Sequence, residues 1–120
     1  MKYFFDSYAV IEIIKGNPKY AKYTYDEVVL TIFNLAEIYW SALNNLGEDA
    51  AEEIFKQYKV SLIEISDSAL KMAIKFRKIH KNKNLSYTDC IGYCIALQNN
   101  LKFLTGDKEF RNMDNVEFVQ

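Results

Sequence analysis

The chain has 120 residues, and its 15 lysines and arginines nearly balance 16 aspartates and glutamates, which leaves a formal net charge of -1. Half of the residues are apolar, 15% are aromatic and 26% are charged, so the composition excludes a disordered chain and predicts a single domain over residues 1–120. The near-neutral charge excludes a strongly basic nucleic-acid scaffold, while one histidine and two cysteines exclude a histidine-rich zinc site and a disulfide framework.

Short apolar segments alternate with helical patterns along the chain. The aromatic segment KYFF at residues 2–5 predicts a buried strand that ends at Asp6, and residues 7–15 predict a helix. Residues 20–26 are polar and rich in tyrosine, a pattern that indicates no particular structure. The remaining predicted elements are, in chain order, a strand at 27–33, helices at 34–47 and 48–57, a strand at 58–65, helices at 67–81 and 86–99, and strands at 101–104 and 115–119.

The order of these elements predicts the fold class. Strands separated by helices are typical of right-handed βαβ crossovers, which build a parallel sheet covered by helices on both faces. Residues 90–101 carry no charge, as expected for a buried helix in such a layer. The sequence therefore predicts an α/β fold of three layers, α/β/α, around a mostly parallel central sheet of about five strands.

The apolar segments also indicate where in the cell the protein is expected. Residues 90–101 form the longest uncharged stretch, which is too short to span a bilayer, and Asp6 interrupts the first apolar run, so no signal peptide is predicted. Cys90 and Cys94 are interpreted as small buried residues in a reducing compartment. We therefore expect a cytoplasmic protein without a membrane partner.

Four acidic residues fall near the carboxyl ends of the predicted strands. Asp6 and Asp107 follow the first and fourth strands, Glu37 lies just past the second, and Asp89 begins the helix that leads to the fourth. Because ligands of open α/β sheets bind beyond these strand ends, we expect the four carboxylates to lie near one another. Like charges so placed need a neutralising cation, and oxygen ligands favour Mg²⁺ or Mn²⁺ over zinc.

Each acid also has a purely structural interpretation. Asp6 and Asp107 suit helix N-caps, Asp89 suits a capping box with Ser86, and Glu37 suits the first turn of a helix. These interpretations stay open for each residue taken singly. They do not explain why four acids gather at one edge of the predicted sheet.

The acids stand in short motifs, which are FFDS at 4–7, NLAE at 34–37, LSYTDCI at 85–91 and FLTGDKEF at 103–110. Together these motifs resemble those of the PIN domain family, and most closely its VapC-type toxin ribonucleases of bacteria and archaea. The last motif, a hydrophobic strand followed by Thr-x-Asp-x-x-Phe, is the most specific. The resemblance covers essentially the whole chain and implies a PIN-like version of the predicted fold.

The resemblance implies a metal-dependent endoribonuclease. Asp6, Glu37, Asp89 and Asp107 are expected to hold one or two Mg²⁺ or Mn²⁺ ions, which activate a water molecule for attack on a phosphodiester. The hydroxyls of Ser7 and Thr105 lie beside the acids in the sequence. They are expected to position water or a carboxylate, with a turn or cap hydroxyl as the alternative.

The resemblance further implies an RNA substrate, a cognate antitoxin protein as partner, and a homodimer. The residues themselves add a run of lysines on one helical face, with a solvated surface as the alternative to phosphate binding. Aromatic residues are abundant, and if exposed their rings stack on unpaired bases, while the alternative is packing in the core or in a dimer or antitoxin interface. The aromatic residues concerned are Tyr20, Tyr23, Tyr25, Tyr39 and Trp40. The lysines expected to contact RNA are Lys71, Lys75, Lys78 and Lys81.

Other functions fit the same pattern. A PIN nuclease of RNA processing or decay shares every motif named above, and a catalytically silent binding module would share the fold alone. A phosphoacceptor receiver domain fits less well, because it requires paired acids after the first strand, where this chain has Asp6 and Ser7, and a lysine after the last.

Overall fold

The central sheet has three parallel strands within residues 2–120, which are the residues that the computed structural model describes. The strands are β1 (Tyr3–Phe5), β2 (Lys102–Thr105) and β3 (Val116–Phe118), in that spatial order. Phe5 pairs with Leu104 across β1 and β2. Parallel pairing brings the carboxyl ends of β1 and β2 to the same edge of the sheet, although nearly the whole chain separates them in the sequence.

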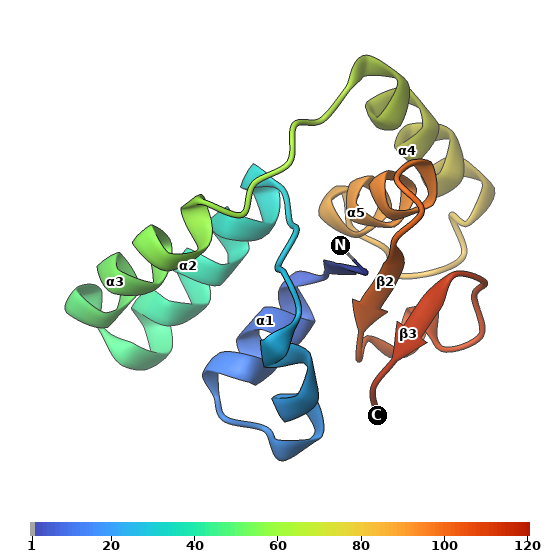
Figure 1. Cartoon of the computed structure of the whole chain (residues 1–120). Helices are drawn as coiled ribbons and strands as arrows, with labels where there is room; N and C mark the ends of the chain where they lie inside the picture. The colour runs from blue at the N-terminus through green and yellow to red at the C-terminus, as the bar shows by residue number, and fades with distance from the viewer. Residues whose placement is uncertain (1) are drawn as a thin grey trace.

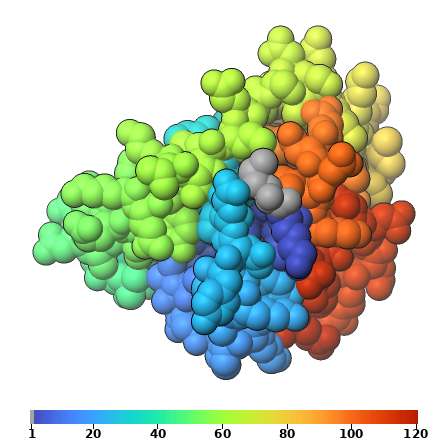
Figure 2. Space-filling model, viewed as in Figure 1, coloured from blue at the N-terminus to red at the C-terminus, as the bar shows by residue number. Residues whose placement is uncertain are grey.

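The helices lie between β1 and β2 in the sequence and surround the sheet in space (Figure 1). α2 and α3 pack together as a pair that forms a green lobe in the space-filling view (Figure 2), while α4 packs on α5. No helix of residues 2–120 has the length and apolar character needed to cross a membrane. The bounds are α1 (Ser7–Ile14), α2 (Ile32–Leu46), α3 (Glu48–Lys59), α4 (Asp67–Ile79) and α5 (Tyr87–Gln98), with 3-10 helices η1 (Pro18–Tyr25) and η2 (Lys108–Phe110).

Two of the predicted strands, at residues 27–33 and 58–65, are wrong. Within the described residues they are reduced to one isolated parallel bridge, between Leu30 and Leu62. α2 begins inside the first segment, and α3 continues into the second. The sheet therefore has three strands rather than about five, while the predicted α/β class and the parallel direction are confirmed.

The start of α2 explains the first of these differences. The Asn34 backbone N–H donates to Thr31 Oγ1 at 3.4 Å, and the Thr31 backbone N–H donates to Asn34 Oδ1 at 3.0 Å. This reciprocal capping box begins the helix inside a β-branched run that, taken alone, favours a strand. Thr31 is thus the N-cap, and the helix begins at Ile32 rather than at residue 34 as the sequence predicts. The Phe5 N–H still donates to the Val29 carbonyl at the sheet edge.

α5 packs directly on one face of the sheet, as its uncharged sequence predicts. The rings of Phe4 and Phe103 stack on this face with centroids 5.9 Å apart. Gly92 lies against them, because a Cβ atom at this position would stand 2.6 Å from the Phe4 ring. The helix of a βαβ unit runs antiparallel to its strands, so this close packing places Asp89, one turn earlier, at the carboxyl edge of the sheet.

The opposite face is covered by α1 and η1. Tyr3 points to this face and meets the Tyr23 ring edge-on, with centroids 5.3 Å apart. The Tyr23 hydroxyl donates to Glu117 Oε2 at 2.6 Å, and the Tyr20 hydroxyl donates to the Val119 carbonyl at 3.2 Å. The tyrosine-rich segment at 20–26 thus buries Tyr20 and Tyr23, which bond to Val119 and to Glu117 of β3, and the predicted three-layer arrangement is confirmed.

Candidate active site

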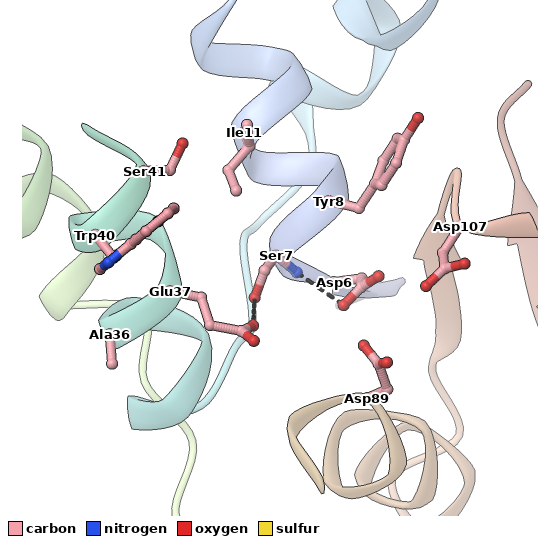
Figure 3. A pocket seen from close by; sticks show the side chains of 10 residues that line it. All are labelled: Asp6, Ser7, Tyr8, Ile11, Ala36, Glu37, Trp40, Ser41, Asp89 and Asp107. Atoms are coloured by element: carbon pink, nitrogen blue, oxygen red, sulfur yellow. Dashed lines mark hydrogen bonds between the residues drawn. The ribbon is translucent and has the colours of Figure 1, made fainter. Parts of the chain in front are cut away.

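A pocket of about 660 Å³ opens at the carboxyl edge of β1 and β2. Its lining includes all four acids singled out from the sequence, and each comes from a different part of the fold (Figure 3). Asp6 follows β1, Asp107 follows β2, Glu37 lies on α2, and Asp89 lies in the first turn of α5.

Asp6 is the most deeply placed of the four, with 2% of its surface exposed. One carboxylate oxygen, Oδ1, accepts a hydrogen bond from the Ser7 backbone N–H at 2.9 Å, and Oδ2 accepts from the Thr105 hydroxyl at 2.7 Å. Thr105 Oγ1 in turn accepts from the Asp107 backbone N–H at 3.0 Å. Thr105 is fully buried, so its hydroxyl fixes the Asp6 carboxylate and the start of the Asp107 turn together.

Glu37 is held by a second chain of hydrogen bonds, which is partly buried. The Asn34 side-chain N–H donates to Ser7 Oγ at 2.9 Å, and the Ser7 hydroxyl donates to Glu37 Oε1 at 2.5 Å. The Thr31 backbone N–H fixes the amide of Asn34 by donating to its oxygen. Since an amide nitrogen only donates, Ser7 accepts from Asn34 and its own proton points to Glu37. Sequence reasoning missed this role of Asn34, whose only signal is its place one turn before Glu37.

Three of the acids also act as caps, as their structural interpretation predicts. Asp6 caps α1, Asp107 Oδ1 accepts from the Glu109 backbone N–H at 3.0 Å, and Asp89 Oδ2 accepts from the Ser86 backbone N–H at 2.9 Å. Capping thus engages one oxygen each of Asp89 and Asp107, and both carboxylates also face the pocket. The first-turn interpretation of Glu37 is wrong, because the first turn of α2 holds no acid.

No basic side chain compensates these carboxylates within the described part of the chain. The pocket lining contains no lysine, arginine or histidine. The ion pairs found among residues 2–120, Lys15 with Glu12 and Lys56 with Glu53, involve none of the four acids. The pocket therefore carries an uncompensated negative charge.

The uncompensated charge and burial favour the protonated forms of these acids. The pKa of Asp6 is raised to about 8, chiefly by burial and next by the charge of Asp89, with smaller contributions from Glu37 and Asp107 and an opposing one from the Thr105 bond. Burial also raises the pKa of Glu37, although the Ser7 bond lowers it. The pKa of Asp89 is raised by burial, in part offset by its bonds to Ser86. Such shifts are common where a fold assembles an active site.

The donor set suits a hard divalent cation. Four carboxylates supply oxygen ligands alone, and the two thiols, Cys90 and Cys94, are buried in α5 outside the pocket lining. Among residues 2–120, however, no three His, Cys, Asp or Glu side chains have the geometry to hold a metal ion as they stand. An ion held by three of these carboxylates would therefore require a movement of at least one side chain.

The hydroxyls and the lysines predicted from the sequence fall into two groups. Ser7 and Thr105 both contact the acids, as described above. Lys71 and Lys75 instead line a separate hollow of about 740 Å³ between α4 and α5, together with Gln98 at the far end of α5. None of the four lysines predicted to contact RNA lines the acid pocket. These lysines are Lys71, Lys75, Lys78 and Lys81.

A model of the PIN domain family matches residues 3–116. No curated protein sequence matches the chain. Among solved structures, the VapC20 toxin of Mycobacterium tuberculosis, which cleaves the sarcin-ricin loop, superposes with a TM-score of 0.83 at 13% identity, covering 99% of this chain and 100% of that one.

Two other solved structures show the same fold. A toxin–antitoxin complex from Klebsiella pneumoniae matches with a TM-score of 0.77 at 18% identity, covering 99% of this chain and 98% of that one. VapBC2 of Rickettsia felis, bound to a promoter DNA fragment, matches with a TM-score of 0.72 at 16% identity, covering 97% and 96%. These three structures are a VapC toxin, a toxin–antitoxin complex and a VapBC complex. The family match over nearly the whole length shows that this chain belongs to the PIN domain family.

Proposed function

We propose that this chain is a metal-dependent endoribonuclease and the toxin of a toxin–antitoxin module. The observation that carries the proposal is the pocket at the sheet edge, where four carboxylates from four elements meet without a basic partner in the lining. Such an arrangement costs folding free energy through repulsion and burial. A bound divalent cation removes that cost, so the arrangement is well explained by metal-assisted hydrolysis.

We assign the ligand role to Asp6, Glu37, Asp89 and Asp107, which would hold Mg²⁺ or Mn²⁺. The ion, when bound, lowers the pKa of a water molecule and offsets charge on the scissile phosphate. Thr105 holds the Asp6 carboxylate through its hydroxyl. The residues that orient Glu37 are Ser7 and Asn34.

The family and its structural neighbours support the proposed roles of RNA and of a protein partner. VapC20 is described as cleaving the sarcin-ricin loop, and two neighbours are toxin–antitoxin assemblies. We propose that this chain likewise cleaves RNA in the cytoplasm, pairs as a homodimer and is held inactive by a cognate antitoxin. The lysines of α4 and its C-terminal loop would contact RNA outside the pocket, at Lys71, Lys75, Lys78 and Lys81.

A catalytically silent binding module is the second candidate. It is favoured by one observation, that no three acids within residues 2–120 are arranged to hold a metal ion as they stand. Titration of Mn²⁺ into the purified protein by calorimetry separates the two candidates. Binding that is lost in Asp89→Asn supports the nuclease, whereas an absence of binding to the folded protein supports the silent module.

Cleavage of total cellular RNA by the purified chain tests the proposed function. We expect cleavage with Mg²⁺ or Mn²⁺, none with excess EDTA, and none for Asp6→Asn or Asp89→Asn. The matched control is Asp67→Asn, an exposed acid of α4 outside the pocket, which should cleave as the wild type does. Cleavage that survives in Asp6→Asn and Asp89→Asn would refute the assignment.

Expression in growing bacteria distinguishes a toxin from an RNA-processing nuclease. A toxin without its antitoxin should arrest growth, and Asp6→Asn should relieve the arrest. If the wild type cleaves RNA in vitro and leaves growth unchanged at matched expression, RNA processing or decay becomes the better assignment.

A further inference from the structure

The turn that ends at Asp107 packs closely against its surroundings at Gly106. A Cβ atom added there would stand 2.5 Å from the Tyr20 hydroxyl oxygen and 2.5 Å from Cε1 of the Tyr8 ring. It would also stand 2.7 Å from the Val119 carbonyl oxygen. These separations are far below van der Waals contact, so only glycine lets the backbone between β2 and η2 lie here. The backbone of the turn is therefore in direct contact with all three groups.

Tyr20 of η1 is held in this contact by hydrogen bonds. Its side chain is buried, and its hydroxyl donates to the Val119 carbonyl at 3.2 Å. The Val119 backbone N–H in turn donates to the Thr105 carbonyl at 2.9 Å. Burial raises the pKa of Tyr20, so the hydroxyl keeps its proton and remains a donor. Through Val119, the Tyr20 hydroxyl is thus joined to the residue that precedes Gly106.

The same turn is bonded to two of the four acids. The Thr105 hydroxyl donates to Asp6 Oδ2 at 2.7 Å and accepts from the Asp107 backbone N–H at 3.0 Å. Glycine has wide backbone freedom, so the turn does not hold itself in one conformation through its own sequence. Its contacts have to do so, and the contact with Tyr20 is made by a buried, hydrogen-bonded group.

The acids need a fixed backbone for a specific reason. Within residues 2–120, no three of them have the geometry to hold a metal ion as they stand, so at least one side chain has to move when an ion binds. Such a movement completes a site only if the backbone that carries the ligands stays in place. A residue that holds the turn before Asp107 would supply this condition.

We propose that Tyr20 is a positioning residue, whose hydroxyl holds the turn at Gly106 and thereby keeps Asp107 in place beside Asp6 for the binding of a divalent cation. The proposal rests on the metal-dependent function proposed above and adds to it a residue outside the pocket lining. The alternative is that Tyr20 only attaches η1 to the residue after β3. The two roles differ in what the loss of the hydroxyl does to Asp107.

The chain offers a matched control in Tyr23. It lies in the same 3-10 helix, is buried as well, and its hydroxyl donates to Glu117 of β3 at 2.6 Å. Tyr20→Phe and Tyr23→Phe therefore each remove one hydroxyl bond between η1 and the chain at or just after β3. Of the two hydroxyls, it is that of Tyr20 that lies against Gly106. Both substitutions keep the ring, so both variants are expected to fold.

Hydrogen exchange of the Asp107 backbone amide tests the contact without any metal. The measurement uses NMR of the protein in EDTA, because this amide donates to Thr105 Oγ1 and its exchange reports the opening of the turn. We expect exchange about tenfold faster in Tyr20→Phe than in the wild type, which corresponds to the loss of roughly one hydrogen bond. In Tyr23→Phe the rate should stay close to that of the wild type.

Calorimetric titration of Mn²⁺ into the same three proteins tests the consequence for the acids. Removal of a group that orients a metal ligand commonly weakens metal affinity 10- to 100-fold. We expect a dissociation constant about tenfold weaker for Tyr20→Phe, and one close to wild type for Tyr23→Phe. Urea denaturation of the two variants shows whether they lose similar stability, so that a difference in Mn²⁺ affinity is not a difference in folding.

The outcomes distinguish this inference from the proposed function. Equal Mn²⁺ affinity for the wild type and Tyr20→Phe would overturn the positioning role and leave the nuclease standing. Equal weakening in Tyr20→Phe and Tyr23→Phe would also overturn it and assign both tyrosines to the stability of the sheet. If the wild type binds no Mn²⁺, the metal-dependent function fails, and the exchange of the Asp107 amide decides alone. Faster exchange confined to Tyr20→Phe would then support Tyr20 as the residue that holds the turn, and unchanged exchange would overturn it.

Discussion

Two hollows of similar size differ in how the fold builds them. The acid pocket has a volume of about 660 Å³ and the lysine hollow between α4 and α5 about 740 Å³. The first draws its side chains from several elements and fixes them by buried hydrogen bonds, such as the one from Thr105 to Asp6. The second is lined by two helices, and its Lys71 and Lys75 are exposed and form no ion pair within residues 2–120.

The comparison teaches that the way side chains are held in place distinguishes a candidate active site from another hollow better than the volume of the hollow does. Holding like charges together lowers stability, and folds retain such arrangements mainly where function requires them. Exposed lysines on a helix cost almost nothing and carry correspondingly little information. Substitutions in the acid pocket should therefore have large effects of two kinds, on activity and on stability, whereas substitutions in the lysine hollow should have small effects on binding alone.

Asp6→Asn should have the largest effect. We expect RNA cleavage to fall by about 10²–10³-fold or more, since a ligand of the proposed metal is removed. The same variant should be more stable than the wild type at pH 8 in EDTA, by the order of a few kcal/mol, because burial of an ionised carboxylate is avoided. Urea denaturation of both proteins measures this difference.

The pH dependence of that difference has a definite sign. The pKa of Asp6 is about 8 in the folded protein, above its ordinary value of 3.8, so the folded state keeps a proton that the unfolded chain has released. The free energy of unfolding of the metal-free wild type should fall between about pH 4 and pH 8, a fall that Asp6→Asn lacks. A variant that is less stable at pH 8, or that shows the same fall, would indicate that Asp6 is mainly a helix cap.

Metal addition should have the next largest effect. A ligand that binds only the folded state at 100 times its dissociation constant stabilises by about 2.7 kcal/mol. We therefore expect Mn²⁺ to raise the thermal unfolding midpoint of the wild type, and EDTA to reverse the rise. In Asp89→Asn the rise should be much smaller, while an equal rise in wild type and variant would place the ion elsewhere.

Ser7→Ala tests the hydrogen-bond chain at Glu37 and should lower cleavage about tenfold, the cost of roughly one hydrogen bond to a charged group. Because the Ser7 bond lowers the pKa of Glu37, its removal should move the acidic limb of the pH–rate profile to higher pH. Ser7→Thr keeps the hydroxyl and serves as the control. A slower Ser7→Ala with an unmoved acidic limb would assign Ser7 to structure alone.

The position of the acids at the sheet edge can be predicted from the sequence more easily than the helices and strands around them, for a physical reason. Asp6 directly follows β1 and Asp107 lies two residues past the end of β2, and strand direction alone brings them to one edge. The secondary structure of residues 27–33 is harder to predict, because their β-branched side chains favour a strand while the capping box of Thr31 and Asn34 starts a helix among them. A single sequence does not tell which local preference prevails once tertiary packing is added.

Asn34 and Trp40 show the same limit within the site. A capping asparagine and a buried donor look alike in sequence, and the contact of Asn34 with Ser7 joins two elements that the sequence separates by 27 residues. The exposure of Trp40 likewise depends on which face of α2 meets the core. By contrast, the capping box of Ser86 and Asp89 is local, and the structure shows it as the sequence predicts.

Substitutions in the lysine hollow should have the smallest effect and depend on RNA length. Lys71 and Lys75 lie with Gln98 at the end of α5 opposite Asp89, nine residues or about 13–14 Å along the helix axis, which is about four stacked nucleotides. The double variant Lys71→Ala, Lys75→Ala should therefore leave the affinity for a trinucleotide unchanged and lower the affinity for a dodecamer two- to threefold.

The dependence of dodecamer binding on salt should also weaken, by about 0.7 in the logarithmic slope for each phosphate that the lysines no longer neutralise. If the trinucleotide and the dodecamer bind more weakly by the same factor, the lysines act through the general field of the protein and not by touching phosphates. If neither the trinucleotide affinity nor the dodecamer affinity changes, the lysine hollow takes no part in RNA binding, and only the acid pocket has a role in function.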